Sequence, residues 1–153
     1  QSIRKNSSLA SLRHLCTPVG WVKEGQERAE VQEHMEGFQI KASSMEELVS
    51  HLSGGNQQKV MLTRWLMTKP RVLIIDEPTK GIDIGARMSI YQIIHQLTQT
   101  GIGILMLTSD MVELIGLSDR TLVFYEGGIV KELSRAEITE ERVMKAASGM
   151  TEG

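Results

Sequence analysis

Two short stretches of this 153-residue sequence have residue types that suit the binding of phosphate and metal. Residues 52–57 read Leu-Ser-Gly-Gly-Asn-Gln and stand directly before an apolar pattern of helical period. A helix start presents unpaired N–H groups and the positive end of the helix dipole, and both favour an anion such as phosphate. Gly54 and Gly55 would let that anion approach the backbone closely, and Ser53 could cap the helix.

The second stretch is residues 72–77, which read Val-Leu-Ile-Ile-Asp-Glu. Its continuous apolar run predicts a strand of a parallel sheet that is covered on both faces. Asp76 and Glu77 follow at the C-terminal end of this strand, where open α/β sheets place their ligands. In phosphoryl-transfer sites an acid at that point holds Mg²⁺, and a following residue can position water.

Each stretch alone has a simpler interpretation, because Ser-Gly-Gly is commonly a turn and Asp-Glu after a strand is commonly a solvated loop start. Their joint order and spacing, with Gly-Ile-Asp at residues 81–83, are far more specific. The sequence resembles the ATP-binding-cassette (ABC) ATPase family. Residues 52–57 are similar to its signature motif, residues 72–77 to its Walker B motif, and residues 81–83 to its D-loop.

The resemblance implies an α/β fold, as a partial P-loop NTPase domain of the ABC ATPase type over residues 1–153. The family's Walker A motif, Gly-x-x-x-x-Gly-Lys-Ser/Thr, occurs nowhere in the sequence. We therefore expect a fragment that begins after Walker A and the Q-loop. Residues 1–69 are expected to form the helical subdomain with the signature motif. Residues 70–153 are expected to form the Walker B half of a mainly parallel sheet.

The elements that must position these motifs are predicted from hydrophobic period, caps and chain breakers. A short helix is expected over residues 9–15, and a capping box of Ser44 with Glu47 is expected to start another. Trp65 is expected to pack inward, and Asp83 could cap the helix that follows it. Further helices are expected over residues 24–38, 56–68, 84–100, 110–116 and 140–147, with strands over residues 71–76, 102–108, 120–125 and 129–133.

A narrower resemblance rests on residues 52–59 and 76–86. They are similar to the second, C-terminal cassette of tandem ATPases that drive bacterial monosaccharide importers of the ribose, galactose, arabinose, xylose and autoinducer-2 types. Where the family has a switch histidine, this sequence has Ser109. A serine hydroxyl can hydrogen-bond phosphate, but it has no positive charge and transfers protons poorly at neutral pH. We therefore expect the chain's own hydrolytic site to be weak or silent.

The resemblance implies ATP and Mg²⁺ as cofactors. It implies that Asp76 holds Mg²⁺ through water, that Glu77 is the nominal base, and that Ser109 is the altered switch. Cassettes of this family work in face-to-face pairs, so the signature motif serves the ATP that the partner cassette holds. The residues implied to face that ATP, or to couple the two cassettes, are Ser53, Gly54, Gly55, Gln57 and Asp83.

The implied partners are a second ABC cassette in tandem or as a dimer, membrane permease subunits and, indirectly, a periplasmic sugar-binding protein. The implied location is peripheral, on the cytoplasmic face of the bacterial inner membrane. A net charge of −2 does not indicate a nucleic-acid partner. Two alternatives stay open: a catalytically silent cassette for dimerisation and permease coupling, and a cytosolic ABC protein without a permease.

Overall fold

The computed structural model describes residues 1–150, which fold into two compact units. The first unit is Gln1–Met106 and the second is Leu107–Gly153, and each is considered by itself. The sequence predicts a different division, between a helical subdomain over residues 1–69 and a Walker B half over residues 70–153. That functional division stays a prediction. Among residues 1–150, none of the helices has the length and apolar character that crossing a bilayer requires.

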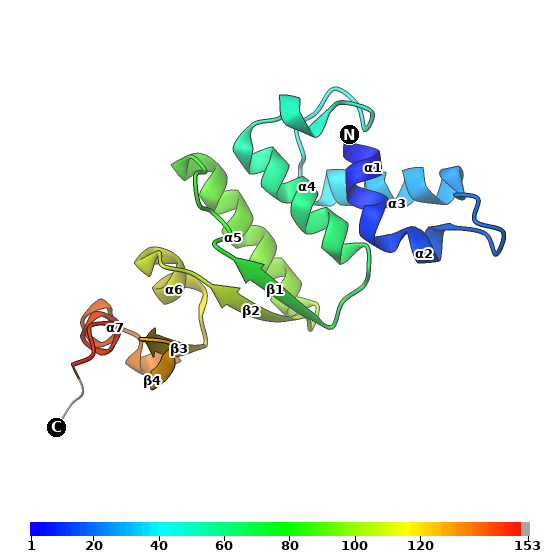
Figure 1. The fold of residues 1–153 in the computed structure, drawn as a ribbon. Helices are drawn as coiled ribbons and strands as arrows, with labels where there is room; N and C mark the ends of the chain where they lie inside the picture. Colours follow the sequence, from blue (N-terminus) through cyan, green and yellow to red (C-terminus); the bar gives the residue numbers. More distant parts are fainter. Residues whose placement is uncertain (151–153) are drawn as a thin grey trace. The chain divides into compact units, whose positions relative to one another are not determined.

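The first unit is largely helical, with two strands near its end (Figure 1). The expected helices over 24–38, 56–68 and 84–100, and the strands over 71–76 and 102–108, are confirmed to within about two residues at each end. The elements are α1 (Ile3–Ser8), η1 (Leu9–Ser11), α2 (Leu12–Leu15), α3 (Glu24–Gly37), η2 (Val49–His51), α4 (Gly54–Leu66), β1 (Val72–Asp76), α5 (Ile84–Gln99) and β2 (Gly103–Leu107).

One apolar core joins α1, α3 and α4. Val31 and Met35 of α3 are four residues apart, so they lie on one helix face and are both buried. Leu62 and Leu66 of α4 are buried, but Trp65 is 51% exposed, so the expectation that it packs inward is wrong. The buried core residues are Ile3, Leu15, Val31, Met35, Ile40, Leu52, Val60 and Met67.

The segment before α4 differs from the sequence expectation. The Glu47 carboxylate accepts hydrogen bonds from the backbone N–H and the hydroxyl of Ser43, both at 2.7 Å, so the expected capping box with Ser44 is wrong. Ile3 N–H donates to the Glu47 carbonyl at 2.9 Å, which ties this segment to α1. Because its backbone groups pair with the chain start, the expected helix is reduced to the single 3₁₀ turn η2.

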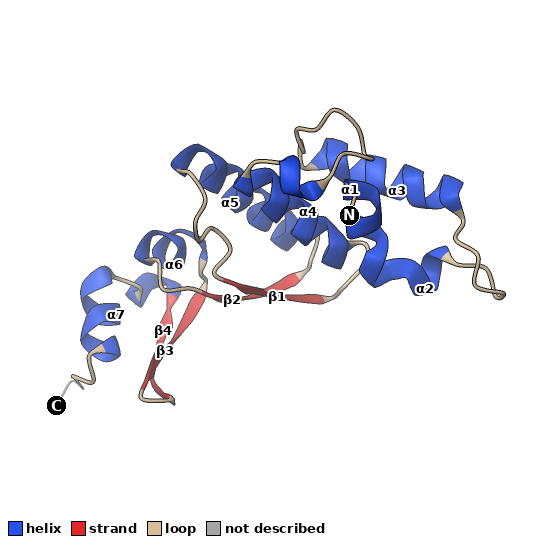
Figure 2. Ribbon diagram, turned by 45° about the horizontal axis from the view of Figure 1, so that its top comes forward, coloured by secondary structure: helices blue, strands red, loops and turns tan. Residues whose placement is uncertain are grey.

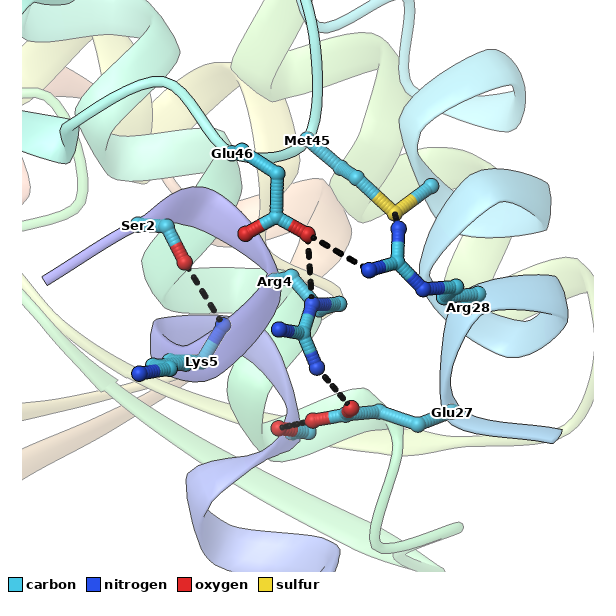
Figure 3. Close-up of polar contacts among 8 residues, drawn as sticks. Ser2, Arg4, Lys5, Glu27, Arg28, Met45 and Glu46 are labelled. Carbon is cyan, nitrogen blue, oxygen red and sulfur yellow. Dashed lines mark hydrogen bonds and ion pairs between the residues drawn. The ribbon is translucent and has the colours of Figure 1, made fainter. Parts of the chain in front are cut away.

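A network of charged side chains also joins α1, α3 and this segment (Figure 3). Arg4 donates to the Glu46 carboxylate at 2.8 Å and pairs with Glu27, which is buried. Ser8 donates from its hydroxyl to the other Glu27 oxygen at 2.6 Å. The hydrogen bond from Arg4 lowers the pKa of the exposed Glu46 carboxyl, and Arg28 adds an ion pair to it at 3.2 Å. Arg4 therefore holds two acids that come from different parts of the chain.

Strands β1 and β2 pair in a two-stranded parallel sheet connected through α5. Helix α5 lies on one side of this pair (Figure 2), and its buried residues include Ile90, Ile93 and Ile94. Along β1 the exposure alternates, so that Leu73 is buried whereas Ile74 is 66% exposed. The expectation that β1 is covered on both faces is therefore wrong within the first unit, where α5 lies on one side of the strand pair and the other face of β1 is exposed.

The second unit contains a β-hairpin and three short helical segments. The expected helices over 110–116 and 140–147, and the expected strands over 120–125 and 129–133, are confirmed, and the two strands pair in an antiparallel hairpin. Glu126 and Gly127 in the hairpin turn both have positive φ, +46° and +81°, which a tight two-residue turn of this kind requires. The elements are α6 (Met111–Leu117), β3 (Arg120–Tyr125), β4 (Gly128–Ser134), η3 (Arg135–Glu137) and α7 (Glu140–Ala147).

Candidate functional site

A pocket of about 570 Å³ lies in the first unit, at the start of helices α4 and α5. Its size is within the range of small-molecule sites. Three of the expected site residues, Ser53, Gly55 and Asp83, line this pocket together, whereas Gly54 and Gln57 are outside its lining. The lining residues are Gln39, Lys41, Ser53, Gly55, Asn56, Lys59, Asp83, Gly85, Ala86, Met88, Ser89 and Gln92.

Ser53 occupies the N-cap position of α4 with extended backbone, φ −62° and ψ 155°. Its side chain makes no capping hydrogen bond, so the expected cap is wrong. The Ser53 hydroxyl oxygen instead accepts from the Asn56 side-chain amide at 3.0 Å. The first-turn N–H groups of α4 are therefore not satisfied by this side chain, and a bound anion could accept from them.

Two side-chain amides stabilise this turn through hydrogen bonds. Asn56 accepts from the Lys41 backbone N–H at 3.0 Å, which ties the segment before the turn to the start of α4. Gln57 donates from its side-chain amide to the Leu52 carbonyl at 2.9 Å. The side chain of Gln57 thus folds back over the turn that precedes it, and its expected contact with ATP stays a prediction.

The two glycines of the turn have different surroundings. A Cβ atom added to Gly55 would lie 2.5 Å from the Ala86 Cβ, closer than real Cβ contacts come. Gly55 is therefore needed for the close approach of α4 to α5, a packing role that the sequence analysis missed. Gly54 is exposed, and the nearest atom to an added Cβ would be the Gly81 carbonyl oxygen at 3.9 Å. Gly54 is the glycine whose backbone is open to a ligand.

Asp83 caps α5, as expected. Its carboxylate accepts from the Ala86 N–H at 2.9 Å, and its backbone is extended, which is the usual N-cap geometry. Asp83 also lines the pocket together with Ser53. The cap therefore fixes the place of this acid next to the turn.

Two lysines of the pocket were missed by the sequence analysis as site residues. Lys59 follows Gly55 by four residues, so it lies on the same face of α4, and its side chain is buried. Burial lowers the pKa of Lys59, and repulsion from Lys41 lowers it further. The helical spacing from Gly55 was the available signal, but it does not reveal burial of the lysine.

The acidic pair stands at the end of β1. Asp76 is exposed there. Glu77 has φ +46°, a left-handed conformation that side-chain-bearing residues rarely adopt and that is found often at functional sites. Thr79, two residues further on, is almost completely buried and anchors the loop that holds this conformation.

Asp76 has the chemistry that Mg²⁺ requires. This ion is commonly held by one or two carboxylates with substrate phosphates and water completing its shell. Within residues 1–150 no group of three or more His, Cys, Asp or Glu side chains could hold a metal ion. An exposed carboxylate such as Asp76 therefore fits Mg²⁺ that arrives with a nucleotide, and its ligation of the ion stays a prediction.

Ser109 belongs to the second unit and is exposed just before α6. Asp110 caps that helix, accepting from the Val112 N–H at 2.8 Å. Thr108 donates from its hydroxyl to the Glu113 carboxylate at 2.5 Å. These contacts fix the local turn that carries Ser109, whereas its expected relation to Asp76 and Glu77 stays a prediction.

Comparison with known proteins places these motifs in a family. The family model for ABC transporters matches residues 1–80. The chain is 46% identical over 148 residues to the ribose import ATP-binding protein RbsA of Oceanobacillus iheyensis. This match covers 97% of the chain and 30% of the relative, so the chain spans less than a third of that protein's length.

Solved structures have the same fold. MJ1267, an ATP-binding cassette of an ABC transporter, superposes with a TM-score of 0.76 at 23% identity, over 95% of this chain and 62% of that one. The ATP-binding cassette MJ0796, in a dimeric post-hydrolysis state bound to ADP and Pi, superposes with a TM-score of 0.74 at 21% identity, over 88% of this chain and 56% of that one. Both matches support a partial cassette with parallel strands.

Proposed function

The chain belongs to the ABC transporter family, and from that membership we propose that it is part of the ATP-binding subunit of a bacterial monosaccharide importer. The support is its 46% identity to a ribose import ATP-binding protein over 97% of its residues. In this role the subunit couples the binding and hydrolysis of ATP to sugar uptake. It lies on the cytoplasmic face of the inner membrane, against permease subunits that receive sugar from a periplasmic binding protein.

The chief contribution of the chain is made in trans, to ATP held by a second cassette. The observation that carries this proposal is the open start of α4, where Gly54 is exposed and the Ser53 side chain leaves the first-turn N–H groups uncapped. Such a helix start stabilises the negative charge of a phosphate group. The similar cassette MJ0796 forms a dimer with ADP and Pi, which is the kind of pairing that the proposal requires.

Asp76 and Glu77 form the nucleotide site that belongs to the chain's own cassette. Bound Mg²⁺ supplies positive charge that offsets the charge on phosphate oxygens. Asp76 would hold the ion through water, and Glu77 would orient the water that attacks the phosphate. The left-handed backbone of Glu77 turns the chain directly after Asp76.

Ser109 weakens hydrolysis at the nucleotide site of the chain's own cassette. The position calls for a group that can carry positive charge or transfer a proton near the phosphate, and a hydroxyl does neither well at neutral pH. This observation also favours a second candidate function, in which the whole cassette is catalytically silent and serves dimerisation and permease coupling. The two candidates differ in whether the signature turn is needed for hydrolysis.

The test is ATP turnover by the longer subunit that contains this chain, with one change in each motif. Gly54→Asp puts a negative charge where the proposal has phosphate, and the open space around Gly54 lets the helix fold. We expect turnover to fall about a hundredfold, because like charges at this distance cost several kcal/mol. Glu77→Gln is expected to leave most of the turnover, because the site it disables is weak. Glu126→Gln, in the exposed hairpin turn, is the control.

The outcomes separate the candidates. Near-total loss of turnover in Glu77→Gln would contradict the proposal that the nucleotide site of the chain's own cassette is weak. Unchanged turnover in Gly54→Asp would contradict the role in trans and favour the silent cassette.

A further inference from the structure

A buried positive charge forms part of the wall of the pocket at the start of α4. Lys59 is only 8% exposed and lines the pocket together with Ser53 and Gly55. Its ammonium group has three donors, and within residues 1–150 it makes a single long hydrogen bond, 3.4 Å, to the Gln39 carbonyl. None of the ion pairs found within residues 1–150 involves Lys59. A buried charge of this kind costs free energy unless a counter-charge reaches it.

A second cation stands in the same wall. Lys41 is exposed and lines the pocket, and its backbone N–H is fixed by the 3.0 Å hydrogen bond to Asn56. Burial, followed by the charge of Lys41, lowers the pKa of Lys59. Two cations that repel one another therefore line one pocket.

The acid of the pocket offsets one of these two positive charges. Asp83 is the single carboxylate among the lining residues, and it accepts the N–H of Ala86 as the cap of α5. The uncapped start of α4 adds the positive end of a helix dipole to the same wall. The pocket is therefore electropositive, although the whole chain has a net charge of −2.

We propose that Lys59 and Lys41 extend the signature turn into a phosphate-binding pocket, in which both ammonium groups contact phosphate oxygens beside the start of α4. A phosphate group offers several charged acceptors, so it satisfies the free donors of Lys59 and relieves the repulsion between the lysines. Where the phosphate belongs to a nucleotide on the second cassette, the proposal rests on the function proposed above. A free phosphorylated compound has the same chemistry.

The direct test is a titration of the chain with inorganic phosphate at constant ionic strength. Amide resonances of residues 53–56 are followed by NMR, and saturable shifts are expected. Lys59→Met keeps the apolar stem in the wall but removes the charge, and it should raise the Kd about tenfold. Lys59→Arg should preserve binding, Lys41→Gln should raise the Kd about threefold, and Lys145→Met in the second unit should change nothing.

Two results would overturn the proposal: no saturable shift at residues 53–56 in the unaltered chain, or an equal Kd in Lys59→Met. Resonances of the helical core report whether a variant is folded. If Lys59→Met fails to fold, Lys41→Gln decides, because Lys41 is exposed and its loss leaves the core intact.

Turnover by the longer subunit identifies the source of the phosphate. A KM for ATP raised about tenfold in Lys59→Met assigns the pocket to the nucleotide, whereas an unchanged KM with lost phosphate binding assigns it to a free phosphorylated compound. Gly54→Asp reports on the signature role by itself. Lost turnover in Gly54→Asp with unaltered phosphate binding in Lys59→Met would refute the lysine pocket and leave the signature role standing.

Discussion

At the scale of single residues, the two adjacent glycines of the turn at residues 52–57 do different work. Gly55 lets the backbone of α4 approach Ala86 at the start of α5, whereas Gly54 faces open space. Both glycines belong to the same motif, yet Gly55 allows the packing of two helices and Gly54 leaves the helix start open. Stability and phosphate binding can therefore be altered separately within one motif.

Replacing Gly55 tests the packing role. Gly55→Ala places a methyl group 2.5 Å from the Ala86 methyl, so one helix must shift. Overpacking of this kind is expected to lower the free energy of unfolding by about 1–3 kcal/mol. The measurement is urea unfolding of the chain, followed by circular dichroism.

Gly54→Ala is the matched control, because an added Cβ there would have its nearest neighbour at 3.9 Å. It should leave the unfolding midpoint unchanged or raise it slightly, since alanine favours a helix more than glycine does. Equal destabilisation in the two variants would show that the contact with Ala86 is not the reason for Gly55.

Residue types and spacing were enough to predict the motif, the cap by Asp83 and the acids after β1. They were not enough to separate Gly54 from Gly55, because the close contact with Ala86 depends on how two helices pack. Lys59 was missed for the same reason. Lys59 contacts the segment at residues 39–41 through the Gln39 carbonyl, and the hydrogen bond between Lys41 and Asn56 ties that segment to the start of α4.

At the scale of elements, the network of Arg4 holds together parts of the chain that precede the turn. Arg4 is on α1, Glu27 is on α3, and Glu46 is in the segment before η2 (Figure 3). Glu27 is 3% exposed, and its carboxylate accepts from Arg4 and from the hydroxyl of Ser8. The network fixes α1 and α3 against the segment that leads into Ser53.

Removing the buried acid is expected to be costly. Glu27→Leu leaves the Arg4 guanidinium with one acid and the Ser8 hydroxyl without its acceptor, so the free energy of unfolding should fall by about 3 kcal/mol. Urea unfolding of the chain is the measurement. Glu46→Gln, at the exposed end of the network, is the control and should change stability much less. A smaller loss in Glu27→Leu than in Glu46→Gln would contradict this account of the network.

Hydrophobic period predicted the order of helices and strands well, because long periodic segments such as α3 and α5 are strong signals. It predicted the caps less well. The carboxylate of Glu47 bonds to Ser43 instead of Ser44, because the backbone of this segment is already paired with α1. Trp65 shows that an apolar residue of a helix is not always turned to the core.

At the scale of the whole molecule, the chain spans 30% of a ribose import ATP-binding protein and 62% of a solved cassette chain. Val72 and Ile74 of β1 form an apolar strand face that is largely exposed. Exposed apolar strands of this kind favour association with another protein surface. The sequence could not predict this exposure, since a continuous apolar run gives no information on what covers it.

The central claim is that the turn at residues 52–57 and the acids Asp76 and Glu77 are parts of nucleotide sites that other segments must complete. The sequence has no Gly-x-x-x-x-Gly-Lys-Ser/Thr loop, whose backbone and lysine make most contacts to nucleotide phosphates. Weak binding of inorganic phosphate through Lys59 is compatible with this claim, whereas tight binding of ATP is not.

Isothermal titration calorimetry of the chain with ATP and Mg²⁺ tests the claim most directly. Without the phosphate-binding loop, we expect no heat of binding at micromolar ATP and no hydrolysis of ATP by the chain alone. A saturable titration with a Kd in the micromolar range would contradict the account, because the chain would then contain a complete nucleotide site.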